Sequence, residues 1–184
     1  MNKLIFTLSL IFSLNSFAQE NKYEPVANKA EYYAVKYLPG KNYMDFRNWV
    51  MENQEKVLNK TDVYDNFDIA LFQPQFGTDL TQFDAVFLGL WPNATEMFAG
   101  MEYWAKNGGE QNAKVPVKTV QAVDTWQWAV SEPEGDPDIG VVRFSDCKMK
   151  DGVNANQVFD ALKDFAIAAK ETGDNLGRKM IFPC

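Results

Sequence analysis

The spacing of hydrophobic residues predicts four strands in the first 130 residues. Short runs rich in aromatic and β-branched residues are typical of strands, and so is the alternation of apolar with polar positions. The first run ends where Pro39 and Gly40 interrupt it. The predicted strands cover residues 31–38, 67–72, 83–91 and 119–130.

Two helices are predicted between these strands, one after the first strand and one after the third. Asn42 and Asn93 each precede a run in which apolar residues recur every three or four positions, and asparagine is a preferred N-cap residue. Asp45 and Glu96 follow these caps by three positions, where an acidic side chain can complete a capping box. The order β-α-β-β-α-β is that of the ferredoxin-like unit, so we expect an α+β fold over residues 30–130.

A further strand, helix and strand are predicted after a linker. Residues 131–138 hold two prolines, one glycine and four acidic residues, a composition typical of a solvated connection. Residues 139–148 then predict a strand, and residues 179–182 predict the beginning of another. Asn154 and Gln157 indicate a capped helix between them. We expect its buried face to hold Val158, Leu162, Phe165 and Ala169, flanked by Phe159 and Ala166.

This last segment is similar to the beginning of the chain in sequence as well as in element order. The five residues from Tyr33 match the five residues from Gly140 in type, and Lys36 stands opposite Arg143. Internal similarity of this kind indicates a repeated unit. We therefore interpret residues 139–184 as a partial second ferredoxin-like unit that lacks its third strand, second helix and fourth strand.

With this element order, and with Lys36 and Arg143 on the two first strands, the chain resembles the dimeric α/β-barrel superfamily over residues 31–130 and again over 139–183. That superfamily includes antibiotic-biosynthesis-type monooxygenases, stress-responsive barrel proteins and NIPSNAP-like proteins. Its members form a barrel from two facing antiparallel sheets, supplied by two chains or by tandem repeats, so the resemblance implies a tandem form. Its catalytic members often use histidine or Asn/Trp constellations, and the resemblance identifies no catalytic residue here.

The first 18 residues have the pattern of a signal peptide. Lys3 gives a positive start, an apolar run follows over residues 4–14, and small residues at Ser16 and Ala18 suit a signal peptidase. The run is too short to span a bilayer, so we expect cleavage before Gln19 and no membrane insertion afterwards. These features predict an exported soluble protein, periplasmic or secreted, from a bacterium. Residues 19–29 are polar and predict a flexible lead-in.

Composition excludes several classes of function. The net charge of −7 becomes −8 when Lys3 is removed with the signal peptide, which disfavours binding to nucleic acid or to anionic membranes. The chain has no histidine, so Ser-His-Asp and Cys-His catalysis are excluded. The acidic linker lacks an EF-hand pattern, and we expect no metal site and no cofactor. For Cys147 and Cys184 we favour two unpaired thiols over a disulfide.

Two candidate ligand-binding groups follow from alternation along the strands. Tyr32 and Lys36 share one face of the first strand, and with Arg143 they could bind a small anion inside a barrel, because a buried cation needs a partner. The alternative is that both cations face solvent or form structural ion pairs. Trp126 and Trp128 share a face on the fourth predicted strand and could stack on a flat ligand, or simply belong to the core.

Asp124 lies on the same face as these two tryptophans and is the candidate catalytic residue. Three functions remain open. The first is the binding of a small anionic or aromatic molecule between the sheets. The second is a cofactor-free oxygenase or isomerase in which Asp124 takes a proton from an acidic carbon or a phenol. The third is an assembly protein that recruits a partner to an exposed strand edge at 179–184. An incomplete second unit also implies either a homo-oligomer or a missing C-terminal segment.

Overall fold

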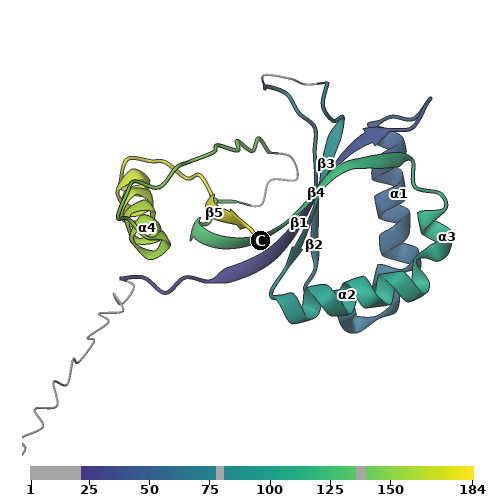
Figure 1. Cartoon of the computed structure of the whole chain (residues 1–184), viewed down its shortest axis with the longest axis horizontal. Coiled ribbons are helices and arrows are strands. Elements are labelled where there is room, and N and C mark those ends of the chain that lie inside the picture. Colours follow the sequence, from purple (N-terminus) through teal and green to yellow (C-terminus); the bar gives the residue numbers. More distant parts are fainter. Residues whose placement is uncertain (1–21, 78–80, 136–139) are drawn as a thin grey trace, which may run out of the picture.

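One open antiparallel sheet of five strands, in the order β2-β3-β1-β4-β5, is the framework of a mixed α+β fold (Figure 1). The computed structural model describes residues 22–77, 81–135 and 140–184, so the expected signal peptide over residues 1–18 lies outside the described residues. The strands are β1 (Ala27–Tyr37), β2 (Asp68–Phe72), β3 (Ala85–Trp91), β4 (Val117–Ser131) and β5 (Arg178–Pro183). The helices are α1 (Tyr43–Lys56), α2 (Ala94–Asn107), α3 (Gly109–Asn112) and α4 (Ala155–Glu171), with short 3₁₀ turns η1 (Leu58–Lys60) and η2 (Asp62–Tyr64).

The first six of the main elements have the predicted order. β1 lies at the centre and pairs with β3 on one side and β4 on the other, and β2 extends the β3 edge. This arrangement is compatible with a ferredoxin-like fold. β5 is added at the other edge, where it pairs antiparallel with the second half of β4.

The three predicted asparagine caps are confirmed. Oδ1 of Asn42 accepts hydrogen bonds from the amides of Met44 and Asp45, and the carboxylate of Asp45 accepts one from the amide of Asn42 in return. Asn93 accepts from the amide of Glu96, and Asn154 and Gln157 form a second reciprocal capping box. Such caps satisfy amide groups that have no partner within the helix, and each contributes about 1 kcal/mol.

Helices α1 and α2 cover one face of the sheet (Figure 1). On β1 this face carries Glu31, Tyr33 and Val35, which alternate with Tyr32, Ala34 and Lys36 on the other face. The main core cluster lies beneath the helices and consists of Val35, Phe46, Val50, Ala85 and Val117.

A β-bulge in β4 changes which residues face these helices. Ala34 of β1 pairs with Gln121, whereas the next residue, Val35, pairs with Thr119, so Val120 is the extra residue on β4. Successive residues of β1 point to opposite faces. Thr119 therefore faces the helices with Val35, while Gln121 faces the opposite side with Ala34.

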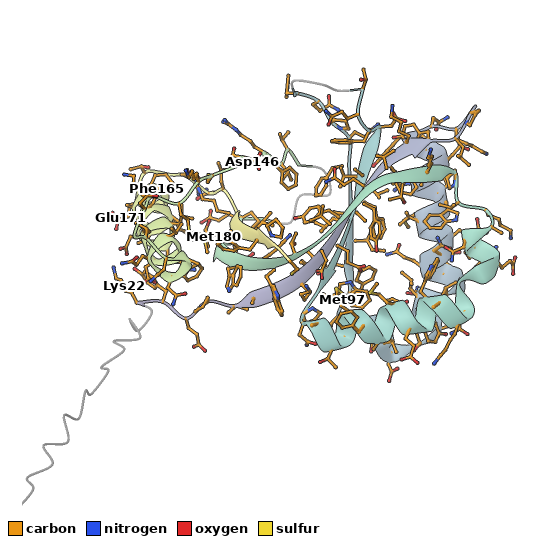
Figure 2. The ribbon with its side chains drawn as sticks, viewed as in Figure 1. Lys22, Met97, Asp146, Phe165, Glu171 and Met180 are labelled. Carbon is orange, nitrogen blue, oxygen red and sulfur yellow. The ribbon has the colours of Figure 1, made fainter. Side chains whose placement is uncertain are left out.

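Helix α4 packs at the far end of the sheet, against β4 and β5, and Met180 of β5 lies on the side towards it (Figure 2). Its buried residues are Phe159 and Ala166, which pack with Val130, Trp128 and Met180. The predicted buried face was wrong in part, because Leu162 and Phe165 are 37% and 56% exposed. The contact of α4 with the sheet is mainly with β4, and it covers the flanking positions instead of the expected stripe.

The strand predicted over residues 139–148 is wrong over the described positions. Residues 140–148 form no strand and are exposed, and β5 joins the first sheet, so the described residues contain no second sheet. A strand forms only where a neighbouring strand can pair with it, and β5 occupies the available edge of β4. Phe144 instead places its ring against the rings of Tyr32 and Phe72, on the sheet face away from α1 and α2, with centroids 5.9 and 6.0 Å away.

The lead-in predicted over residues 19–29 contacts α4 at its first described residues and overlaps β1 at its end. The amide of Lys22 donates to Asp160 at 3.0 Å, and the hydroxyl of Tyr23 donates to Asp164 at 2.6 Å, so these residues are bound to α4. Figure 2 shows Lys22 beside this helix. β1 then begins at Ala27, earlier than predicted. Within the described ranges no helix combines the length and the apolar character that a bilayer span requires.

Candidate functional site

A cavity of about 410 Å³ lies between the sheet and helices α1 and α2. Its walls are mainly apolar and rich in aromatic rings. Trp49 comes from α1, Trp91 from the end of β3 and Trp104 from α2. Other rings come from β1, α1, η2 and β3, and from Phe67 just before β2. The cavity has the size and the lining of typical small-molecule sites, which are largely apolar with a few placed polar groups.

Glu31 provides the one charged side chain among the described residues that line this cavity. It is only 9% exposed, because it lies in the middle of β1 on the face that the helices cover. Its Oε2 accepts a hydrogen bond from Nε1 of Trp91 at 2.8 Å, and its Oε1 accepts one from the hydroxyl of Tyr33 at 2.8 Å. Burial raises the pKa of Tyr33, and the neighbouring charge and hydrogen bond of Glu31 raise it further.

Three stacked or tilted rings support this end of the cavity. Trp91 stacks on Phe67 with centroids 4.1 Å apart, and Tyr64 lies 5.6 Å from each of them. The hydroxyl of Tyr64 donates to the carbonyl of Gly100 at 2.6 Å, and burial is the main cause that raises its pKa to about 12. Both tyrosines are therefore protonated at neutral pH, so their hydroxyls are fixed as donors.

The other end of the cavity is built around two tryptophans whose ring centroids are 6.3 Å apart. Nε1 of Trp49 donates to the carbonyl of Gln111 at 3.0 Å, and Nε1 of Trp104 donates to Oδ1 of Asn112 at 3.2 Å. Asn53 of α1 also lines the cavity and is 4% exposed, yet its Oδ1 accepts no hydrogen bond in the described part of the chain. Buried polar atoms are nearly always paired, so this oxygen is available to a bound molecule or to water.

The predicted catalytic residue, Asp124, lies outside this lining. Its carboxylate pairs with Nζ of Lys29 at 2.5 Å. The Lys29 side chain is 4% exposed, and its ammonium also lies 4.8 Å from the ring of Trp126 and 3.1 Å from Sγ of Cys184. Burial tends to lower the pKa of Lys29, but the hydrogen bonds with Asp124 and Cys184 and their charges raise it overall. Asp124 therefore balances a buried lysine, and Trp126 covers that lysine.

The remaining predicted ligand-binding residues are divided between different parts of the molecule. Trp128 packs edge-on against Phe182 at 5.1 Å and belongs to the core beneath α4. Tyr32 accepts a hydrogen bond from Gln127 and, with Lys36, faces away from α1 and α2. Arg143 lies in the exposed segment outside any strand. The sheet thus separates Tyr32 and Lys36 from Asp124 and the two tryptophans. Arg143 precedes Phe144, whose ring contacts that of Tyr32 on the same face.

Sequence reasoning did not identify Glu31 or Asn53 as site residues. A signal for Glu31 was present, because it is the one acidic residue on the β1 face that otherwise carries Tyr33, Val35 and Tyr37. Asn53 interrupts the apolar stripe of α1 in the same way. In both cases the polar residue that interrupts an apolar face is a residue that lines the cavity.

The two cysteines, Cys147 and Cys184, are both free and exposed. The chain matches no protein-family model and no curated protein sequence. Any conclusion about its function therefore depends on the geometry of the cavity and on the chemistry of the side chains that line it.

Proposed function

We propose that the protein binds a small, mainly apolar molecule in the cavity between the sheet and helices α1 and α2. The observation that carries this proposal is an aromatic cavity of about 410 Å³ with a buried carboxylate in its wall. Filling such a space with side chains would stabilise the fold, since unfilled volume costs packing energy. Binding of a ligand gives a reason for the space, and this site replaces the one expected between two facing sheets.

The hydrogen bonds that the lining residues already form limit which kinds of ligand fit the cavity. The indole N–H groups of Trp49, Trp91 and Trp104 are all used within the protein. These rings therefore offer apolar surface to a ligand rather than hydrogen-bond donors. The buried acceptors that remain available are the carboxylate of Glu31 and Oδ1 of Asn53. A ligand with a ring and a hydrogen-bond donor fits this lining, whereas an anion would be repelled by Glu31.

Thr119→Trp is expected to weaken binding of a neutral probe, tert-butylbenzene, by at least about tenfold, which corresponds to about 1.4 kcal/mol. Thr119 lines the cavity but is itself exposed, so an indole at this position would occupy the space without disturbing the buried core. Isothermal titration calorimetry measures the affinity. A thermal unfolding curve without ligand checks the fold, which should change by no more than about 0.5 kcal/mol.

The matched control is Gln121→Trp. Gln121 is exposed on the same strand but faces the opposite side of the sheet because of the β4 bulge. It should bind tert-butylbenzene as the unmodified protein does. Equal affinity in the Thr119 variant, or no binding by the unmodified protein, would count against the proposal.

We also propose that the protein functions outside the cytoplasm, because residues 1–18 have the charge, apolar and cleavage-site pattern of a signal peptide. Expression of the full chain in a bacterium should yield exported protein whose first residue is Gln19. Intact mass spectrometry of the periplasmic and medium fractions measures this. A chain that keeps residues 1–18 and stays in the cytoplasm would reject the export proposal and leave the binding proposal untouched.

A further inference from the structure

The carboxylate of Glu31 is buried in the wall of the cavity. It forms no ion pair among the described residues, and the nearest lysine on its strand, Lys29, pairs with Asp124 instead. Its two oxygens accept one hydrogen bond each, although a carboxylate can accept about four in total. A buried charge normally has a partner, so this position lacks an interaction that a ligand could supply.

The aromatic surroundings are suited to the same kind of ligand. Rings attract cations through their π faces when the charge lies within about 6 Å of the ring centroid, and tryptophan does so most strongly. Trp91 and Tyr33 contact Glu31 directly through hydrogen bonds, and Tyr64 and Phe67 pack on Trp91. No lysine or arginine is found among the described residues that line the cavity.

We infer that the ligand of this cavity is an organic cation, with an alkylated or quaternary ammonium group held between Glu31 and the neighbouring rings and an apolar body that extends towards Trp49 and Trp104. This inference rests on the proposed function and specifies its ligand class. An alkylated ammonium group suits the site better than a primary ammonium ion, because its methyl groups pack against rings and do not require many hydrogen-bond acceptors.

The test compares three probes that share a phenyl ring and a tetrahedral head group but differ in charge: phenyltrimethylammonium, tert-butylbenzene and benzenesulfonate. Calorimetry on the full mature chain should show that phenyltrimethylammonium binds at least about tenfold more tightly than tert-butylbenzene, and that benzenesulfonate binds most weakly. Equal affinity for the cation and the neutral probe would overturn the inference but support the proposed function. The absence of binding by all three probes would overturn the proposed function itself.

Glu31→Gln tests whether the carboxylate of Glu31 causes the preference for the cation over the neutral probe. This variant should reduce the advantage of the cation to about threefold or less, while the affinity for tert-butylbenzene stays within about threefold. The matched control is Glu102→Gln, which removes the same charge from an exposed position on α2 and should keep the full preference. An unchanged preference in Glu31→Gln would overturn the inference.

Asn53→Asp provides a second variant should Glu31→Gln fail to fold. It adds a carboxylate of the same shape at the unpaired Oδ1 position in the cavity wall. The preference for phenyltrimethylammonium over tert-butylbenzene should increase by at least about threefold. A preference that stays constant or falls would contradict a cationic ligand.

Discussion

Gly100→Ala is expected to lower the free energy of unfolding by about 2 kcal/mol, even though alanine favours helices more than glycine by about 1 kcal/mol. Gly100 lies in the middle of α2 and is buried against Trp91. A Cβ atom at this position would lie 2.7 Å from Cζ3 and 3.0 Å from Cζ2 of the indole, and closer still to Cη2. These separations are too short for unbonded carbon atoms, so either the ring or the helix must move.

The indole of Trp91 cannot move without further loss. It is 3% exposed, it stacks on Phe67, and its N–H group donates to the buried carboxylate of Glu31. Displacing the ring would break this hydrogen bond inside the protein, which adds to the cost of the clash. The substitution should therefore also disturb the cavity, because Trp91 is part of its wall.

Urea denaturation and thermal unfolding measure this effect, and for a chain of this size about 2 kcal/mol corresponds to a decrease in Tm of about 4–8 °C. Gly109→Ala is the control, since a Cβ atom there meets nothing within 4 Å. Gly109 is the first residue of α3, so alanine should be neutral or slightly stabilising. Equal or greater stability of Gly100→Ala would show that α2 does not pack as closely on Trp91 as described.

Asp124→Asn is expected to destabilise the protein by about 2–3 kcal/mol, because it leaves the buried ammonium of Lys29 without its carboxylate. Losses of this kind reach 3–5 kcal/mol in fully buried pairs. The expected value is smaller here because the Asp124 side chain is 41% exposed and water partly screens the pair. The free energy of unfolding from urea titrations provides the measurement.

Lys29→Met should cost at least about 1 kcal/mol less than Asp124→Asn, since it leaves a carboxylate that water can reach instead of a buried cation. The double variant should recover most of the stability lost in Asp124→Asn, which a double-mutant cycle reveals as a coupling of about 1 kcal/mol or more. Additive effects of the two substitutions would contradict a direct ion pair. A carboxylate whose main role is catalytic would also show no such coupling in stability.

Local signals in the sequence predicted most of the first 130 residues. The asparagine caps at positions 42, 93 and 154 are short-range features that depend on residues three positions away, and all three form. β1 to β4 were predicted because alternation and aromatic content do not depend on distant partners. Their antiparallel order about β1 is compatible with the ferredoxin-like connection pattern.

The errors occurred where the outcome depended on a distant neighbour. Residues 140–148 contain Val141, Val142 and Phe144 and have a strand-like composition, but the free edge of β4 is taken by β5, and Phe144 packs on a face of the sheet instead. The apolar stripe of α4 has a helical period, yet which of its positions are buried depends on the distant residues that pack against the helix. The cavity was missed for the same reason, because its walls come from many elements and empty space has no pattern in sequence.

The extra residue in β4 has a consequence for how this strand tolerates change. Even-numbered side chains such as Asp124 share the helix-covered face on one side of Val120, and odd-numbered ones such as Thr119 share it on the other. The alternation of side chains between the two faces of β4 therefore changes phase at Val120. Deletion of Val120 would remove this change of phase, although the composition would change by only one valine. Val117 and Thr119 would then point away from α1 instead of towards it. Homologous chains with one residue more or fewer at this position would turn opposite sets of side chains of this strand towards the interior, despite similar sequences.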